Sequence, residues 1–225
     1  MHLEEALSSK MDIKAFIFDM DGLLFDSERI VQRSWEMAGD ELGIPHMGDV
    51  IYHTLGMNRT GRNEYFRKYI REDFPFEEFG RLTRDNFWKI VDKEGLPLKK
   101  GVKELLAYGK AQGYKMAVAT SSSREYAMGN LIRAGIDSYF DSVVCGDMVK
   151  KAKPDPEIYQ KACESLGIQP EYCMAFEDAP GGILSAHQAG MHVIMVPDLV
   201  QPTQEIRELT YRVCDSLADV IGILN

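Results

Sequence analysis

The stretch that decides the fold is AFIFDMDGLLFDSE, residues Ala15–Glu28. Its apolar run, Ala15–Phe18, is typical of a strand buried on both faces. The carboxylates of Asp19 and Asp21 follow at the carboxyl end of this strand, which is the edge where open α/β sheets bind ligands. Because a single aspartate is more often an ordinary turn or cap residue, the interpretation depends on residues further along the chain.

The composition is that of a globular protein with an acidic balance. The chain has 225 residues, of which 45% are hydrophobic and 27% charged. Its 26 basic and 35 acidic side chains give a net charge of −9, which argues against nucleic acid or an anionic membrane as a partner. No apolar run reaches the roughly 18 residues of a membrane span, and the N-terminal segment lacks the pattern of a signal peptide. We therefore expect a soluble cytoplasmic protein.

The region 27–96 differs from the rest of the chain in its periodicity. Apolar residues recur at helical spacing from Val31 to Leu42, and further helical patterns follow without the regular strand–helix alternation seen later. We expect a small helical cap domain with its own core in this region. It would be inserted between the two parts of an α/β core domain, 1–26 and 97–225.

Strand-like and helix-like segments alternate regularly from residue 97 onward. Apolar strands are predicted at 114–119, 142–145, 172–176 and 192–196. Alternation of this kind predicts an α/β fold with a Rossmann-like parallel sheet and right-handed crossovers.

Capping residues predict where two of the helices begin. Ser122 or Ser123 is expected to cap the helix after the second strand, with Ile132 on its inward face. Asp155 as the N-cap and Pro156 at the first helical position are expected to open the helix after the third strand.

Polar side chains end or closely follow three of the later predicted strands. They are Thr120, Lys153, Glu177 and Asp178. Taken singly, each has an ordinary interpretation as a cap, a solvated lysine or an acidic loop. Carboxylates that converge at one edge repel each other by about 4 kcal/mol per close pair at an effective dielectric of about 20, and they would not all stay ionised unaided. A hard divalent cation resolves this conflict, and oxygen ligands without histidine or thiol favour Mg²⁺.

Four motifs in this order resemble those of the haloacid dehalogenase-like hydrolases: DMDG, VATSS, KPDPEIY and FEDAPGG. The helical insertion after the first motif is similar to the cap of their subfamily I, which contains the β-phosphoglucomutase-like phosphatases. The resemblance extends over about residues 13–220. It implies a Mg²⁺-dependent phosphatase that hydrolyses a small phosphorylated metabolite, with a sugar phosphate as the leading candidate.

The resemblance also implies roles for individual residues. Asp19 would attack phosphorus and become an aspartyl-phosphate, and Asp21 would act as general acid and base. Thr120 and the amide of Ser121 would bind the phosphoryl oxygens. Lys153 would neutralise both the phosphate and the nucleophile. The Mg²⁺ ligands would be Asp19, the backbone carbonyl of Asp21, Glu177 and Asp178.

Substrate identity is expected to depend on the insertion, because a cap contacts the part of the substrate beyond the phosphate. The turn with Asn58 and Arg59 resembles the stretch where sugar-phosphate members place an arginine, although an exposed loop arginine is an equally ordinary interpretation. Glu28 is a second candidate for substrate binding. Nucleotide monophosphates, polyol phosphates and phosphoglycolate remain open as substrates.

Two alternatives to the phosphatase remain. The β-phosphoglucomutases carry a histidine in the first cap helix, and Val31 stands at that place, which favours a phosphatase over a mutase. A non-catalytic binding protein on the same fold is the other alternative, although every catalytic position holds a competent residue type. Asp21 favours phosphate-ester chemistry, since the C–Cl dehalogenases of the superfamily lack an aspartate there.

Overall fold

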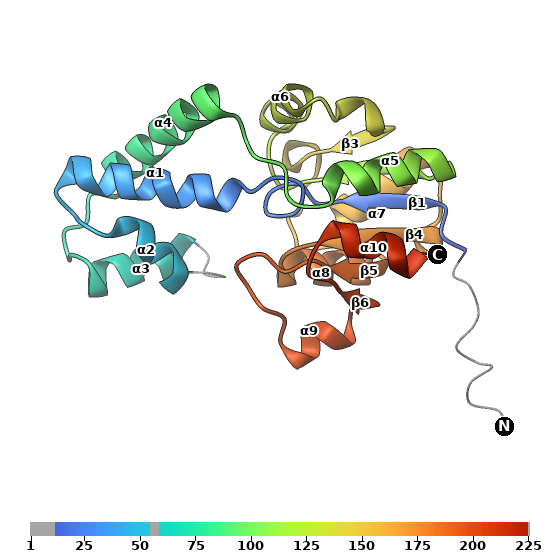
Figure 1. The fold of residues 1–225 in the computed structure, drawn as a ribbon. Coiled ribbons are helices and arrows are strands. Elements are labelled where there is room, and N and C mark those ends of the chain that lie inside the picture. Colours follow the sequence, from blue (N-terminus) through green and yellow to red (C-terminus); the bar gives the residue numbers. More distant parts are fainter. Residues whose placement is uncertain (1–11, 55–58, 225) are drawn as a thin grey trace.

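The centre of the fold is a parallel β-sheet whose middle strand is β1. A computed structural model describes residues 12–54 and 59–224, without the side chains of residues 59 and 60. Within this part the sheet has six strands in the order β3-β2-β1-β4-β5-β6, all paired in parallel (Figure 1). The strands are β1 (Ala15–Phe18), β2 (Lys115–Ala119), β3 (Ser142–Val144), β4 (Cys173–Glu177), β5 (His192–Met195) and β6 (Arg212–Val213). The carboxyl ends of β1, β2 and β4 therefore meet at one edge.

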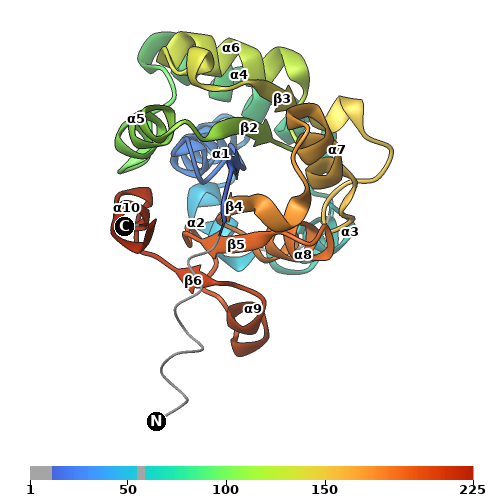
Figure 2. The ribbon, with the colours of Figure 1, turned by 90° about the vertical axis from the view of Figure 1, so that its right-hand side faces the viewer.

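Alternate residues of β1 contact two separate apolar layers, as the pleat of a strand requires. Phe16 and Phe18 pack with residues of α5, α6 and α10, and Ala15 and Ile17 pack with residues of α7, α8 and α9. Figure 2 shows α5 and α10 on one side of the sheet and α7 and α8 on the other. The helices are α5 (Val102–Gln112), α6 (Arg124–Ala134), α7 (Glu157–Leu166), α8 (Pro180–Gln188), α9 (Gln204–Glu208) and α10 (Leu217–Leu224). This is the three-layer α/β/α arrangement that the sequence predicted.

The regular elements described between β1 and α5 are all helices. They are α1 (Ser27–Leu42), α2 (Met47–His53), α3 (Arg59–Tyr69) and α4 (Phe76–Glu94). They lie beside the end of β1 in Figure 1 and share an apolar cluster of their own. The Trp35 ring meets Phe66 and Phe79 edge-on at centroid distances of 5.7 and 5.6 Å, so these aromatic residues pack against each other. The carboxyl-terminal part of α4 instead joins the core of the sheet through Ile90 and Val91.

Several sequence-based boundaries differ from the structure. The short strand β6 was not predicted, because two residues cannot display a period. Glu177 is the last residue of β4 and does not lie beyond it. Ile132 was expected to face inward, but it is 58% exposed, because Ala127 and Leu131 make the buried contacts of α6.

A side-chain hydrogen bond lies at each of the two predicted helix starts. Ser123 caps α6, since its hydroxyl accepts the Tyr126 N–H at 3.4 Å. The predicted start of α7 was wrong by one residue, because the helix begins at Glu157 and Pro156 precedes it. The Asp155 carboxylate still accepts the Glu157 N–H at 3.0 Å and so satisfies a backbone donor of the first turn.

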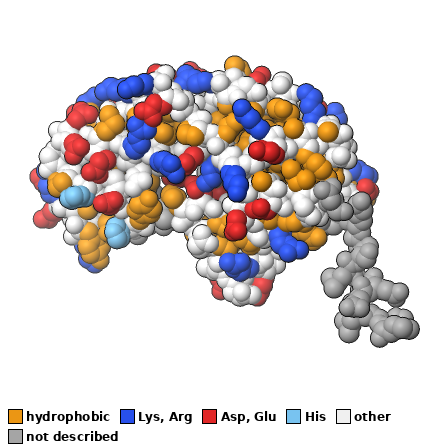
Figure 3. All heavy atoms as spheres, in the orientation of Figure 1, with side chains coloured by type: hydrophobic (Ala, Val, Ile, Leu, Met, Phe, Trp, Pro, Cys, Tyr) orange, Lys and Arg blue, Asp and Glu red, His pale blue; other side chains and the backbone are white. Residues whose placement is uncertain are grey.

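The surface drawn in Figure 3 carries acidic and basic side chains interspersed over the helical insertion and the sheet. A notch on this face separates the insertion from the lower part of the sheet domain. None of the described helices combines the length and the apolar composition that a bilayer crossing requires.

The glycines at the two ends of α5 provide a test of how this helix packs. Gly101 and Gly113 have φ of +86° and +79°, so alanine is strained at both. A Cβ at Gly101 would overlap the backbone of Ala218 in α10, whereas a Cβ at Gly113 would have no neighbour within 4 Å. We predict that Gly113→Ala lowers the free energy of unfolding by about 1 kcal/mol, and that Gly101→Ala costs about 2 kcal/mol more because α10 must move. Urea unfolding of both variants measures the difference, and equal losses would contradict the packing of α10 on α5.

Candidate active site

Three carboxylates meet where β1 and β4 end. These strands pair with Phe18 opposite Phe176, and the Asp19 N–H continues the pairing by donating to the Phe176 carbonyl at 3.0 Å. Asp19 follows β1, and Glu177 and Asp178 end and follow β4. One carboxylate oxygen from each of these three residues lies within 4.8 Å of the others. The register of two neighbouring strands therefore assembles the acidic cluster, which we define as Asp19, Glu177 and Asp178.

Lys153 reaches into the acidic cluster from the segment before α7. Its Nζ donates to Asp19 Oδ1 and Glu177 Oε1, both at 2.6 Å, and to the Ala119 carbonyl at 3.0 Å. Burial acts to lower the pKa of Lys153, but the carboxylates of Asp19 and Glu177 outweigh it and hold this pKa above its ordinary value. Lys153 is therefore a fixed positive charge shared by two carboxylates.

One lysine does not balance the charge of the acidic cluster. The Asp178 carboxylate has no hydrogen-bond or ion-pair partner among the described side chains. Burial raises the pKa of Asp19 to about 8, with Lys153 opposing the shift and Glu177 adding to it. Burial and then the carboxylates of Asp19 and Glu177 raise the pKa of Asp178 well above its usual range. Either protons or a cation must compensate the remaining negative charge.

The surroundings of the acidic cluster fit a hard divalent cation. A Cβ at Gly22, where φ is +84°, would overlap the Asp178 carboxylate, and a Cβ at Gly182 would overlap that of Glu177. Backbone can therefore approach the carboxylates closely at both glycines. All three donors are oxygens, which suits Mg²⁺ or a similar ion.

Asp21 lies beside the acidic cluster, and its carboxylate is held by two hydroxyl groups. The Ser122 hydroxyl donates to Oδ2 at 2.7 Å, and the Tyr126 hydroxyl donates to Oδ1 at 3.0 Å. Both donors come from the segment that follows β2. The Asp21 carboxylate is not one of the three groups of the described acidic cluster, so its predicted contribution to a metal site rests on the backbone carbonyl.

Thr120 and Ser121 follow β2, directly next to β1. Thr120 is buried, and its hydroxyl oxygen accepts the Ser122 N–H at 3.1 Å, which leaves the hydroxyl proton available to a ligand. Ser121 is exposed, and its carbonyl packs so closely against Gly146 that a Cβ there would overlap it. Both residues therefore reach the edge of the sheet where Asp19 lies.

Glu28 lines a cavity of about 430 Å³ together with Asp178 and Asp198. Burial raises the pKa of Glu28, and the carboxylates of Asp198 and Asp21 raise it further. Glu28 is thus near the acidic cluster, in acidic surroundings, and its predicted part in substrate binding stays a prediction. Asn58 and the side chain of Arg59 lie outside the part of the chain that the structure describes.

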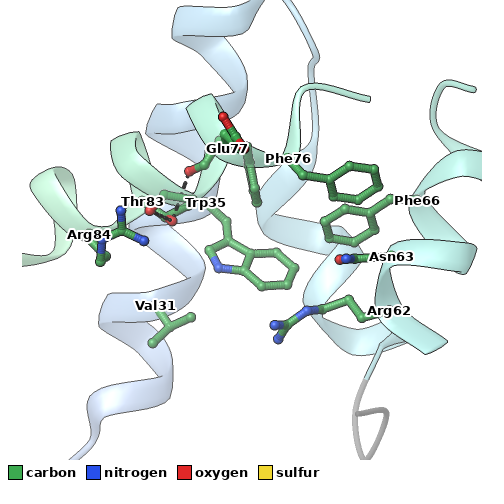
Figure 4. Close-up of a pocket in the computed structure, with 11 residues that line it drawn as sticks. Val31, Trp35, Arg62, Asn63, Phe66, Phe76, Glu77, Thr83 and Arg84 are labelled. Carbon is green, nitrogen blue, oxygen red and sulfur yellow. Dashed lines mark hydrogen bonds between the residues drawn. The ribbon is translucent and has the colours of Figure 1, made fainter. Parts of the chain in front are cut away.

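A larger cavity of about 680 Å³ lies among α1, α3 and α4 (Figure 4). The Trp35 ring forms part of its wall, and the guanidinium of Arg62 lies 5.7 Å from the centre of that ring. Arg84 contributes a second guanidinium from α4, and neither arginine forms an ion pair with a described carboxylate. A neighbouring cavity of about 250 Å³ shares Val31, Trp35 and Arg84 with the first and also contacts Tyr126. The residues that line these two cavities thus extend from Tyr126, a hydrogen-bond partner of Asp21, to the interior of the insertion.

Sequence reasoning did not assign several residues that the structure places at these sites. They are Arg62, Arg84, Ser122, Tyr126 and Tyr159, whose hydroxyl donates to Glu177 Oε1. Ser122 and Tyr159 lie within the quoted motifs and could have been considered from the sequence. Arg62 is one helical turn beyond Arg59, whereas no sequence signal identified Arg84 or Tyr126.

Comparison with known proteins finds related chains. The family model described as haloacid dehalogenase-like hydrolase matches residues 16–196. The chain is 33% identical to the phosphorylated carbohydrates phosphatase of Thermotoga maritima over 182 residues, which are 81% of this chain and 84% of that protein. It is 32% identical to hexitol phosphatase A of Escherichia coli K12 over 186 residues, 83% of this chain and 84% of that protein.

Solved structures show the same fold. The crystal structure of CbbY from Rhodobacter sphaeroides in complex with phosphate aligns with a TM-score of 0.71 at 27% identity, covering 92% of this chain and 96% of that one. The ordered motifs, the parallel sheet and these matches together establish that the chain belongs to the haloacid dehalogenase-like hydrolase family.

Proposed function

We propose that the chain is a Mg²⁺-dependent phosphatase that hydrolyses a small phosphomonoester of the sugar-phosphate class through an aspartyl-phosphate. The observation that carries this proposal is the buried acidic cluster, in which one lysine bridges Asp19 and Glu177 while the Asp178 carboxylate has no hydrogen-bond or ion-pair partner among the described residues. In this arrangement the carboxylates can neutralise a cation, and the lysine can neutralise a phosphoryl group bound with it. Named relatives that are phosphatases support the same chemistry.

Asp19 would be the nucleophile. Its Oδ1 is bound by Lys153, and its second oxygen would attack phosphorus while the bond to the leaving oxygen breaks. Asp21 would give a proton to that leaving oxygen, so that an alcohol departs. In the second step a water would attack phosphorus, Asp21 would take its proton, and Asp19 would leave as a carboxylate together with free phosphate.

The remaining polar groups would bind the phosphoryl oxygens. Thr120 would donate its hydroxyl proton and Ser121 its amide, and Lys153 would supply positive charge from the opposite side. Asp19, Glu177, Asp178 and the backbone carbonyl of Asp21 would hold the metal ion. When bound, that ion would polarise the phosphoryl group and offset the charge of the carboxylates.

The helical region 27–96 would be the cap domain that receives the sugar, with 1–26 and 97–225 as the core domain. Its cavity has a volume typical of small-molecule sites. The Trp35 ring offers a flat surface to a sugar, and Arg62 and Arg84 offer donors to its hydroxyl or anionic groups. The names of the two relatives, which refer to phosphorylated carbohydrates and hexitols, support this substrate class.

The side chain at position 31 favours a phosphatase over a phosphosugar mutase. Val31, at the place where the mutases carry a histidine, lines both of the cavities that contain Trp35. Its apolar side chain can neither donate nor accept a proton there. Water is then the expected acceptor of the phosphoryl group.

Replacing the nucleophile tests the proposed chemistry directly. We expect Asp19→Asn to reduce phosphate release from a panel of small phosphomonoesters in Mg²⁺ at least about a thousandfold, because an amide cannot form the acyl-phosphate. Borohydride reduction of acid-quenched wild-type enzyme should convert phosphorylated Asp19 to homoserine, which peptide mass spectrometry detects.

Asp85→Asn is the matched control for this experiment, since Asp85 pairs with Arg81 on the exposed face of α4. We expect it to retain wild-type activity. Equal phosphate release from Asp19→Asn and wild type, or none from wild type on the whole panel, would exclude the proposed reaction.

Metal binding should displace protons at neutral pH. The raised pKa of Asp19, about 8 without metal, means that this carboxyl is protonated at about pH 7 and ionised at about pH 9. A cation requires the ionised form, so the apparent Mg²⁺ affinity should fall as the pH is lowered from about 8. Calorimetric titration with MgCl₂ in two buffers of different ionisation enthalpy should give buffer-dependent heats at about pH 7 and a smaller buffer dependence at about pH 9, where Asp19 is already ionised. Buffer-independent heats at both pH values would contradict this linkage.

Arg62 tests the substrate side of the proposal. We expect Arg62→Ala to raise KM for the best sugar phosphate of the panel about tenfold, which is the loss of one charge-assisted hydrogen bond. Inhibition by inorganic phosphate should be unchanged, since phosphate alone does not extend into the insertion. Arg81→Ala is the control, because Arg81 pairs with Glu78 and Asp85. Loss of sugar-phosphate and phosphate binding in parallel would show that Arg62 acts elsewhere.

A further inference from the structure

Tyr126 is a residue outside the quoted motifs that contacts a proposed catalytic group. It lies in the first turn of α6, and its hydroxyl donates to Asp21 Oδ1 at 3.0 Å. With Ser122 on Oδ2, both oxygens of Asp21 are held in place.

The ring of Tyr126 contacts the insertion at the same time. Its centre lies 5.6 Å from that of Trp88 in a T-shaped arrangement and 6.2 Å from that of Phe87. Both aromatic residues belong to α4. The smaller cavity, of about 250 Å³, is also lined by Tyr126, Phe87 and Trp88. One side chain therefore joins α4 to the carboxylate of Asp21.

We propose that Tyr126 is a positioning residue for Asp21, which sets the orientation of its carboxylate for proton transfer to the leaving group and couples that orientation to the packing of α4. This inference rests on the proposed phosphatase function. A carboxylate free to rotate presents its proton in many directions, and proton transfer requires one. Tyr126 restricts this rotation through its hydroxyl, and α4 restricts the position of the Tyr126 ring.

The role predicts an effect that depends on the leaving group. Expulsion of an alkoxide requires a proton from Asp21, whereas p-nitrophenolate leaves without one. A variant with a misplaced Asp21 should therefore lose activity on benzyl phosphate and keep it on p-nitrophenyl phosphate. A general structural disturbance would slow both reactions to the same extent.

The experiment measures single-turnover release of benzyl alcohol and of p-nitrophenol, with enzyme in excess and saturating Mg²⁺, so that only phosphoryl transfer to the enzyme is observed. We expect Tyr126→Phe, which keeps the ring and removes the hydroxyl, to slow release of benzyl alcohol about tenfold. Release of p-nitrophenol should change less than about twofold, and substrate dissociation constants should not change. Tyr211→Phe, at an exposed tyrosine remote from the described site, should match wild type on both substrates.

Trp88→Ala tests the contact with α4 while leaving the Tyr126 hydroxyl intact. Trp88 is 41% exposed, so its truncation is compatible with folding even if Tyr126→Phe is not. We expect about a threefold loss with benzyl phosphate only. No loss in either variant, or equal losses on both substrates, would overturn the positioning role. A wild type inactive on both substrates would overturn the proposed function, and this inference with it.

Discussion

The structure depends on three carboxylates that meet around one buried lysine. Lys153 touches Asp19 and Glu177 at 2.6 Å each, and the Asp178 carboxylate has no partner among the described side chains. Removing such groups from water costs several kcal/mol per ion unless the charge is compensated. The folded chain therefore carries excess negative charge at one point. In the proposed function, a cation that binds together with a phosphoryl group would compensate this charge.

The topology of the sheet places this negative charge at the edge formed by the carboxyl ends of the strands. Because β1 lies between β2 and β4, three strand ends converge. The ends of β1 and β4 each deliver a carboxylate pair, and the end of β2 delivers a hydroxyl. The helical insertion leaves the sheet directly after β1, so it begins within a few residues of Asp19. In the proposed function, binding of phosphate and selection of the rest of the substrate would thereby belong to separate parts of the chain that meet at one edge.

Residues whose position follows from strand order could be predicted from the sequence, and residues placed by packing between distant helices could not. Asp19 and Asp178 follow β1 and β4, whose apolar runs are clear, and the parallel order of these strands brings both carboxylates to one edge. The Tyr126 contact with Asp21 depends instead on how α6 is placed against the segment that follows β1, which no local pattern encodes. Ile132 shows the same limit, since its helical period was correct while the side chain is exposed.

This division suggests how one set of family motifs can serve different substrates. In the proposed function, the motif residues would form a phosphoryl site that is largely independent of the insertion, since their contacts run among strand ends. Tyr126 contacts both parts, because its hydroxyl binds Asp21 while its ring lies against Trp88 and Phe87. A shift of α4 would then alter the geometry of proton transfer without changing the acidic cluster. Chain-specific residues at this boundary, more than the motifs, are where rate and substrate choice can be adjusted together.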